Sequence, residues 1–156
     1  MCIFYITKKG YENLYKEYKN VDMEIKQILK EIGESVKRDN DLRENSEFMQ
    51  LRVKAMYELP AKKKEIWNQY KKAIIIEEQN EYINFDNKTV ILGSVVTMNF
   101  SGDIYKYTIL GTNEGNIENN ILSCEAPISK AILGKKIGDK ILFRNETIEI
   151  LNVEKY

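Results

Sequence analysis

The sequence predicts an α+β protein in which an N-terminal antiparallel coiled-coil hairpin precedes a C-terminal, mainly antiparallel β-sheet domain with one short helix. Two observations predict this arrangement. Apolar residues recur at alternating steps of three and four over residues 11–32, which is the spacing of a coiled-coil seam. From Val90 onward, β-branched and aromatic residues alternate between turn signals. We therefore place a coiled-coil domain at 1–78 and a β domain at 79–156, with the boundary within 77–84.

The composition excludes several classes of function. The chain has 156 residues with 24 basic and 24 acidic side chains, no histidine, and two cysteines, Cys2 and Cys124. The lack of histidine excludes Ser-His and Cys-His catalysis and histidine-ligated zinc. Equal charge counts argue against strong binding to free DNA, because such binders usually carry a basic excess. No apolar run approaches the ~18 residues of a membrane helix, and the apolar patch at 2–5 is too short for a secretory signal, so we expect a cytoplasmic protein with reduced thiols.

The first predicted helix carries a regular apolar seam. Its seam positions are Tyr11, Leu14, Tyr18, Val21, Ile25, Ile28 and Ile32. Thr7 precedes the seam as a plausible N-cap. The alternative is a long amphipathic helix on a globular core, but regular heptads with charged flanks favour the coiled coil.

The second predicted helix returns along the first and is less regular. Its seam positions are Phe48, Leu51, Ala55, Leu59, Ile66, Tyr70 and Ala73. Pro60 removes a backbone hydrogen bond, so we predict a bend around residues 56–60. Between Leu59 and Ile66, the expected apolar position falls on Lys62. An arm of about 25–30 residues per helix reaches roughly 40 Å at ~1.5 Å per residue.

The C-terminal half predicts a small sheet with one helix. The candidate strands are Ser94–Asn99, Tyr105–Leu110, Lys140–Phe143 and Thr147–Val153, and the candidate helix is Ile128–Leu133. The sequence Ser101-Gly102-Asp103 is typical of a hairpin turn between the first two strands.

The segment between the two helices is acidic, because Asp39, Asp41 and Glu44 lie within six residues. One interpretation is a capping box, in which Asp41 accepts from the N–H of residue 44 and Glu44 reaches back to the N–H of residue 41. The other is a ligand site, because carboxylate oxygens are what Mg²⁺ prefers. Two carboxylates hold Mg²⁺ weakly alone, but they would complete a half-built site in another macromolecule for phosphodiester hydrolysis. The two interpretations are compatible, since a capped turn is also rigid.

Five short motifs follow one another along nearly the whole chain. They are Thr7-Lys8-Lys9-Gly10-Tyr11 with Leu14 and Glu17; Asp41-Leu42-Arg43-Glu44-Asn45-Ser46-Glu47-Phe48; Gly93-Ser94-Val95-Val96-Thr97; Tyr107-Thr108-Ile109-Leu110-Gly111; and Ser123 with Pro127-Ile128, Ala131-Ile132-Leu133-Gly134-Lys135-Lys136 and Gly138-Asp139. Each motif alone is weak, whereas five in this order and spacing are specific. In them the sequence resembles the Gre transcript-cleavage factors of bacterial RNA polymerase, most of all the GreA type.

The resemblance implies an FK506-binding-protein-like (FKBP-like) fold for the C-terminal domain and a coiled coil that enters the secondary channel of RNA polymerase. Asp41 would help hold the second catalytic Mg²⁺ beside the polymerase's own aspartates, and Glu44 would position the attacking water. Both are thus expected catalytic and metal-binding residues within the polymerase site. The protein would stimulate cleavage of the RNA 3′ end in backtracked complexes, with no activity alone and no stably bound cofactor.

The resemblance also implies contact residues outside the acidic turn. Lys37 and Arg52 match basic positions that face the extruded RNA, although from spacing alone solvated helix charges are the stronger explanation. The loop at Glu125, Ala126 and Pro127 would grip the rim of the channel. The expected partners are thus bacterial RNA polymerase and the nascent RNA, with no membrane and little free DNA.

Three departures and three competing functions accompany this reading. Asn40 and Ala126 replace a glycine and a serine usual in the family, and Pro60 stands where a small or flexible residue is usual.

An anti-cleavage relative would occupy the same channel and block it. A peptidyl-prolyl isomerase would need a tryptophan-floored pocket in the sheet domain, but Trp67 lies in the hairpin. A structural coiled-coil adaptor would not need the acidic turn.

Overall fold

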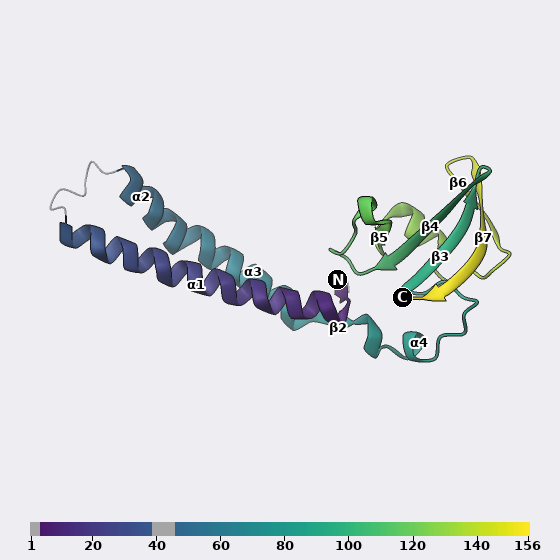
Figure 1. Cartoon of the computed structure of the whole chain (residues 1–156), viewed down its shortest axis with the longest axis horizontal. Helices are drawn as coiled ribbons and strands as arrows, with labels where there is room; N and C mark the ends of the chain where they lie inside the picture. The colour runs from purple at the N-terminus through teal and green to yellow at the C-terminus, as the bar shows by residue number, and fades with distance from the viewer. Residues whose placement is uncertain (1–3, 39–45) are drawn as a thin grey trace. The chain divides into compact units, whose positions relative to one another are not determined.

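The computed structural model describes residues 4–38 and 46–156 (Figure 1). Contacts divide them into two compact units. The helical unit is Glu12–Lys72, and the sheet unit joins the described residues up to Tyr11 with Ala73–Tyr156. The predicted fold class, an N-terminal helical hairpin followed by a β-sheet domain, is confirmed.

The helical unit is an antiparallel hairpin. Helix α1 (Lys8–Arg38) packs along a return segment made of α2 (Ser46–Val53), a π-helix at Lys54–Glu58, and α3 (Leu59–Lys72) (Figure 1). The buried seam consists of Val21, Ile28, Ala55, Leu59 and Ile66, flanked by the half-buried Leu14, Tyr18, Ile25, Ile32 and Leu51. All of these are predicted seam positions. Burial of an aliphatic side chain stabilises by about 1.5–3 kcal/mol, so the seam holds the hairpin together.

The return helix changes register within the π-helix. The N–H of Leu59 donates to the carbonyl of Lys54, five residues back, so this turn holds one extra residue. The extra residue keeps Leu59 and Ile66 in the seam and moves the intervening seam position from Lys62 to Lys63. Our assignment of Lys62 to the seam was therefore wrong. Pro60 directly follows the π-helix, within a return segment that stays helical from α2 through α3, and the bend predicted at 56–60 stays a prediction.

Lys63 is accommodated in the seam by a carboxylate on the facing helix. Asp22 accepts hydrogen bonds from the ammonium groups of Lys26, at 2.7 Å, and of Lys63. The Lys63 ammonium also lies 5.0 Å from the centre of the Tyr18 ring. Hydrogen bonds from Lys26 and then Lys63 lower the pKa of Asp22 to about 2. The pair thus fills a seam position that an apolar residue would otherwise occupy.

The first turn of α1 is capped from the sheet unit as well as locally. The Thr7 hydroxyl accepts from the N–H of Gly10 at 3.0 Å, which confirms Thr7 as the N-cap. Glu114 accepts from the N–H of Thr7 at 2.9 Å, and Glu77 accepts from the N–H of Lys8 at 2.9 Å. A Cβ atom on Gly10 would lie 2.3 Å from the Glu114 carboxylate, so glycine leaves room for this acceptor.

The strand before α1 pairs with the strand after α3. Strands β1 (Phe4–Ile6) and β2 (Ala73–Ile75) are parallel, with Phe4 opposite Ala73. A 3-10 turn at Ile76–Glu78 and the short helix α4 (Asn80–Ile83) follow. Because of these pairings, contacts assign both ends of the hairpin to the sheet unit, whereas the periodicity of the sequence placed the division at 77–84.

The second sheet has five strands in the order β5-β4-β3-β7-β6. The strands are β3 (Ser94–Phe100), β4 (Asp103–Leu110), β5 (Ile121–Ser123), β6 (Lys140–Phe143) and β7 (Glu146–Lys155). All four predicted strands are present. Neighbours are antiparallel except β4 and β5, which are parallel. The predicted turn at Ser101-Gly102 is confirmed: both residues have positive φ, and the Asn99 side chain accepts from the N–H of Gly102 at 2.9 Å.

The core of the sheet unit lies on one face of this sheet. Its members are Val90, Val96, Met98, Ile109, Ile132, Ile148, Ile150 and Val153, all at most 2% exposed. Helix α5 (Pro127–Ile132) supplies Ile132 and places the half-buried Ile128 against the cluster. In β3, buried and half-buried residues alternate from Ser94 to Met98 because successive side chains point to opposite faces.

Candidate functional site

The acidic segment joins the two helices of the hairpin. Helix α1 ends at Arg38 and α2 begins at Ser46, so residues 39–45 make the connection. Asp41 and Glu44, the predicted catalytic and metal-binding residues, lie outside the described residues. The capping-box and Mg²⁺ interpretations of these two carboxylates therefore both stay predictions.

The two predicted RNA-facing residues lie on the helices beside this connection. Lys37 belongs to the last turn of α1, but its side chain is outside the described ones. Arg52 lies in the last turn of α2, and its side chain is exposed. An exposed guanidinium here is available to a phosphate or a carboxylate.

The predicted rim-contact loop is a well-defined turn before α5. The Ser123 hydroxyl donates to the carbonyl of Thr112 at 2.9 Å and accepts from the N–H of Glu125 at 3.2 Å. Ala126 has extended backbone angles and caps α5, and Pro127 follows in the first turn, where a proline loses no helix hydrogen bond. Glu125 and Pro127 are exposed, whereas Ala126 is half-buried. The loop thus presents a carboxylate and an apolar ring on a fixed backbone.

Four aromatic side chains, Tyr15, Tyr18, Trp67 and Tyr70, form a cluster on the hairpin, and only Tyr18 and Tyr70 among them were predicted as seam positions. The ring centres lie 5.5 Å apart for Tyr15 and Tyr70, 5.1 Å for Tyr18 and Trp67, and 5.4 Å for Trp67 and Tyr70. The Lys19 ammonium lies 5.4 Å from the centre of the Tyr15 ring. Aromatic residues spaced three apart on both helices, at 15 and 18 and at 67 and 70, were the available signal. Stacking of these rings stabilises the pairing of α1 with α3.

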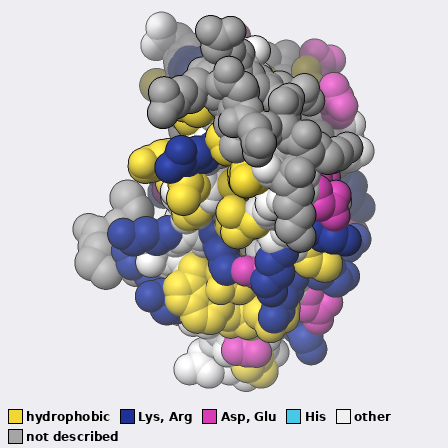
Figure 2. Space-filling view, turned by 90° about the vertical axis from the view of Figure 1, so that its left-hand side faces the viewer, with side chains coloured by type: hydrophobic (Ala, Val, Ile, Leu, Met, Phe, Trp, Pro, Cys, Tyr) yellow, Lys and Arg dark blue, Asp and Glu magenta, His cyan; other side chains and the backbone are white. Residues whose placement is uncertain are grey.

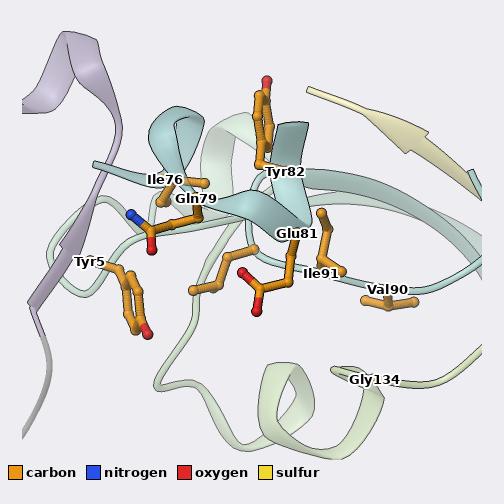
Figure 3. Close-up of a pocket in the computed structure, with 9 residues that line it drawn as sticks. Tyr5, Ile76, Gln79, Glu81, Tyr82, Val90, Ile91 and Gly134 are labelled. Atoms are coloured by element: carbon orange, nitrogen blue, oxygen red, sulfur yellow. The ribbon is translucent and has the colours of Figure 1, made fainter. Parts of the chain in front are cut away.

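A cavity of about 260 Å³ lies in the sheet unit between α4 and the loop before β3 (Figure 3). Its lining is mainly apolar, with polar groups from Tyr5, Gln79 and Glu81. In Figure 3 the Tyr5 ring and the Glu81 carboxylate face the same space, whereas the Tyr82 ring points away. The Gln79 amide donates to the carbonyl of Ile75 at 3.0 Å. The lining contains neither tryptophan nor a paired acid and base, so it does not match an isomerase or hydrolase centre.

The shifted pKa values of the sheet unit have structural causes. Hydrogen bonds from the backbone of Thr89 and Lys88 and from the Thr89 hydroxyl lower the pKa of Asp86 to about 2. Burial, followed by the charge of Glu77, raises the pKa of Tyr82, whose hydroxyl donates to the carbonyl of Tyr156 at 2.6 Å. Over residues 4–38 and 46–156, no three His, Cys, Asp or Glu side chains gather as a metal site. None of the helices described is long and apolar enough to cross a membrane.

Comparison with known families gives two matches that together cover most of the chain. Residues 4–75 match the family described as "Transcription elongation factor, N-terminal", and residues 86–155 match "Transcription elongation factor, GreA/GreB, C-term". The first match spans the hairpin and the strands at its two ends, and the second spans the five-stranded sheet.

Individual relatives agree with these matches. The chain is similar to transcription elongation factor GreA of Thermosipho melanesiensis, with 30% identity over 89% of this chain and 86% of that protein. It is 33% identical to GreA of Syntrophus aciditrophicus, over 87% of this chain and 83% of that protein. GreA of Bacillus cytotoxicus is 29% identical, over 95% of this chain and 99% of the relative.

The chain also aligns with solved structures. GreA factor homolog 1 (Gfh1) of Thermus thermophilus aligns with a TM-score of 0.41 and 20% identity, over 96% of this chain and 97% of that one. GreA/GreB from Nitrosomonas europaea aligns with a TM-score of 0.42 and 18% identity, over 60% and 79%. The sequence matches in both halves, with relatives aligned over more than four fifths of their length, show that this chain belongs to the GreA/GreB family of transcription elongation factors.

Proposed function

We propose that the protein binds bacterial RNA polymerase, inserts its helical hairpin into the secondary channel, and stimulates cleavage of the RNA 3′ end in backtracked, arrested complexes. The observation that carries this proposal is the position of the acidic segment: it connects Arg38 at the end of α1 to Ser46 at the start of α2. With 31 residues at ~1.5 Å each, α1 is roughly 46 Å long, which suits an arm that reaches into another molecule.

The chemistry assigned to the acidic segment rests on two carboxylates. Asp41 would contribute an oxygen ligand to a Mg²⁺ that the polymerase active site supplies, since Mg²⁺ is usually held by one or two carboxylates together with waters and phosphates. Glu44 would orient the attacking water by accepting a hydrogen bond from it. A metal ion at such a site stabilises the charge that develops on the phosphate during hydrolysis. The protein would act only together with the polymerase, because two carboxylates alone hold Mg²⁺ weakly.

Residues outside the acidic segment would position the factor. Lys37 and Arg52 would contact the phosphates of the extruded RNA, and the exposed guanidinium of Arg52 is compatible with this role. The loop at Glu125, Ala126 and Pro127 would hold the rim of the channel, for which its rigid backbone and exposed Pro127 are suited.

Stalled, backtracked complexes of a bacterial RNA polymerase test this function directly. Adding the protein should shorten the RNA from its 3′ end. Asp41→Asn and Glu44→Gln should each lower the cleavage rate by about 10²-fold or more at saturating factor, because both carboxylates act on a charged transition state. Loss of a cap alone costs only ~1 kcal/mol of stability, which saturation and a melting control separate from the chemical effect.

Glu34→Gln is the matched control, since it removes an exposed carboxylate from α1 outside the acidic segment. If the polymerase cleaves normally with both Asp41→Asn and Glu44→Gln, the two carboxylates have only the capping role. If the wild-type protein instead suppresses cleavage by the polymerase alone, the factor is an inhibitor that occupies the same channel.

A further inference from the structure

The return segment of the hairpin carries apolar side chains outside the seam as well as within it. One face makes the seam, with Ala55 and Leu59 buried against α1. On other faces Met49, Val53, Met56 and Tyr57 are 48%, 44%, 51% and 70% exposed. We call these four side chains the outer patch. Val53 lies four residues after Met49, three before Met56 and four before Tyr57, so each of the other three is its neighbour on the helix surface.

The outer patch borders an open groove. Met49 and Val53 line it together with Gln50, Lys54 and Glu58, and its volume is about 460 Å³. The π-helix at Lys54–Glu58 forms part of its wall, and such turns often occur at functional positions. Figure 2 shows hydrophobic side chains among charged ones on the face of the molecule that it draws. A groove with apolar walls on an exposed helix is a surface that a partner can cover.

The charges around the groove favour a protein partner over a nucleic acid. The Lys54 ammonium lies 2.7 Å from a carboxylate oxygen of Glu24 on the facing helix, and the hydrogen bond that Lys54 donates to Glu24 raises the pKa of Lys54. Among the residues that line the groove, Lys54 and Glu58 carry one charge of each sign, so their charges sum to zero. A polyanion gains little at a surface without net positive charge. An apolar protein surface with mixed polar edges is complementary to it.

The size of the patch argues against a second copy of this chain as the partner. If each side chain presents about half of a ~200 Å² surface, the patch exposes roughly 400 Å². Specific, stable interfaces bury about 800 Å² on each partner. The patch therefore suits one part of a larger contact, as arises when an arm is enclosed by another protein.

We infer that the outer patch is a docking surface for an apolar protein surface of RNA polymerase, which the hairpin contacts along α2 and the π-helix. This inference rests on the proposed function, because it assumes that the hairpin enters the polymerase. It adds a contact that is separate from the acidic segment and from the loop before α5. Met49 and Val53, which line the groove, are its central residues.

The test is a titration of wild-type protein and of the double variant Met49→Gln, Val53→Thr into backtracked polymerase complexes, with binding and RNA cleavage followed together. Both substitutions preserve side-chain shape and add polar atoms. We expect the concentration for half-maximal binding and cleavage to rise about tenfold, with the cleavage rate at saturation unchanged. Met23→Gln is the matched control, because Met23 is 59% exposed on α1 and does not line the groove.

Each outcome decides one question. Wild-type protein that neither binds nor promotes cleavage overturns the proposed function and this inference with it. If the wild-type protein is active, but the double variant and Met23→Gln need the same concentration for half-maximal binding and cleavage, the inference alone is overturned. Sedimentation at the same concentrations should show a monomer, and a dimer that the double variant abolishes would assign the patch to a second copy instead. Melting curves of the variants should match the wild type, since all three positions lie outside the seam.

Discussion

Substitution of Glu114 tests how the first turn of α1 is held in the sheet unit. One carboxylate oxygen accepts from the N–H of Thr7 at 2.9 Å and from the N–H of Gly111 at 3.1 Å. The other accepts from the Thr7 hydroxyl at 2.5 Å. Glu114→Ala would leave both backbone donors without this acceptor. Glu114→Gln would keep one acceptor oxygen in place but remove the charge.

The expected magnitudes follow from these contacts. A buried donor left unpaired costs about 1–3 kcal/mol. Thr7 is 5% exposed, but Glu114 itself is half-buried, so water can partly replace the carboxylate. We therefore expect Glu114→Ala to lower the free energy of unfolding by about 2–3 kcal/mol. Glu114→Gln should cost about 1 kcal/mol, the part that comes from a negative charge at the positive end of a helix and from charge-assisted hydrogen bonds.

Urea denaturation followed by far-ultraviolet circular dichroism measures both values, with Trp67 fluorescence as a separate probe of the hairpin. Glu118→Ala is the control, because Glu118 is an exposed carboxylate on the same connection between β4 and β5. Its effect should stay within about 0.5 kcal/mol. A Glu114→Ala variant no less stable than Glu118→Ala would refute the capping argument. If Glu114→Ala and Glu114→Gln lower the free energy of unfolding equally, the stabilisation comes from the negative charge of Glu114 and not from its acceptor oxygen.

Two further predictions concern the seam of the hairpin. Lys63→Glu should lower the melting temperature of the hairpin by roughly twice as much as Lys62→Glu. The reason is that the Lys63 side chain is 28% exposed and paired with Asp22, whereas the Lys62 side chain is 55% exposed and paired with Glu17. Equal decreases in melting temperature, followed by Trp67 fluorescence, would contradict the register set by the π-helix. Asp22 has a folded pKa of about 2, below its ordinary 3.8, so the stability it contributes is present above about pH 4 and is lost as the pH falls toward 2. In Asp22→Asn, the melting temperature followed by Trp67 fluorescence should therefore fall less between pH 4 and pH 2 than it does in the wild type. An equal fall in both proteins would assign the pH dependence to other carboxylates.

The sequence by itself determined the elements that depend on local spacing. The three-and-four repeat placed the seam on Val21 and Ile28, since these positions fall on one face of α1 whatever lies opposite. Thr7 as the N-cap and Ser101-Gly102 as the hairpin turn were also predictable, because each depends on its own few neighbours. The acidic connection carrying Asp41 and Glu44 likewise comes from the sequence and stays its prediction.

Only the tertiary structure decided which distant residues meet. Thr7 and Glu114 are separated by 107 positions, and the parallel pairing of Phe4 with Ala73 joins the two ends of the hairpin. The local sequence pattern does not specify such partners. A strand or cap pattern predicts that a residue has a hydrogen-bonding partner, but it does not identify that partner when it lies far away in the sequence. The parallel placement of β5 beside β4 has the same origin.

The π-helix shows the same limit within a single helix. The spacing of the sequence does not show that one extra residue is accommodated between Ala55 and Leu59, and this extra residue sets which later side chains face α1. A one-residue change of register rotates every later side chain by about 100°, so it exchanged Lys62 for Lys63 in the seam. Local periodicity determines that a face exists, whereas the packing of two helices against each other selects the register that buries it.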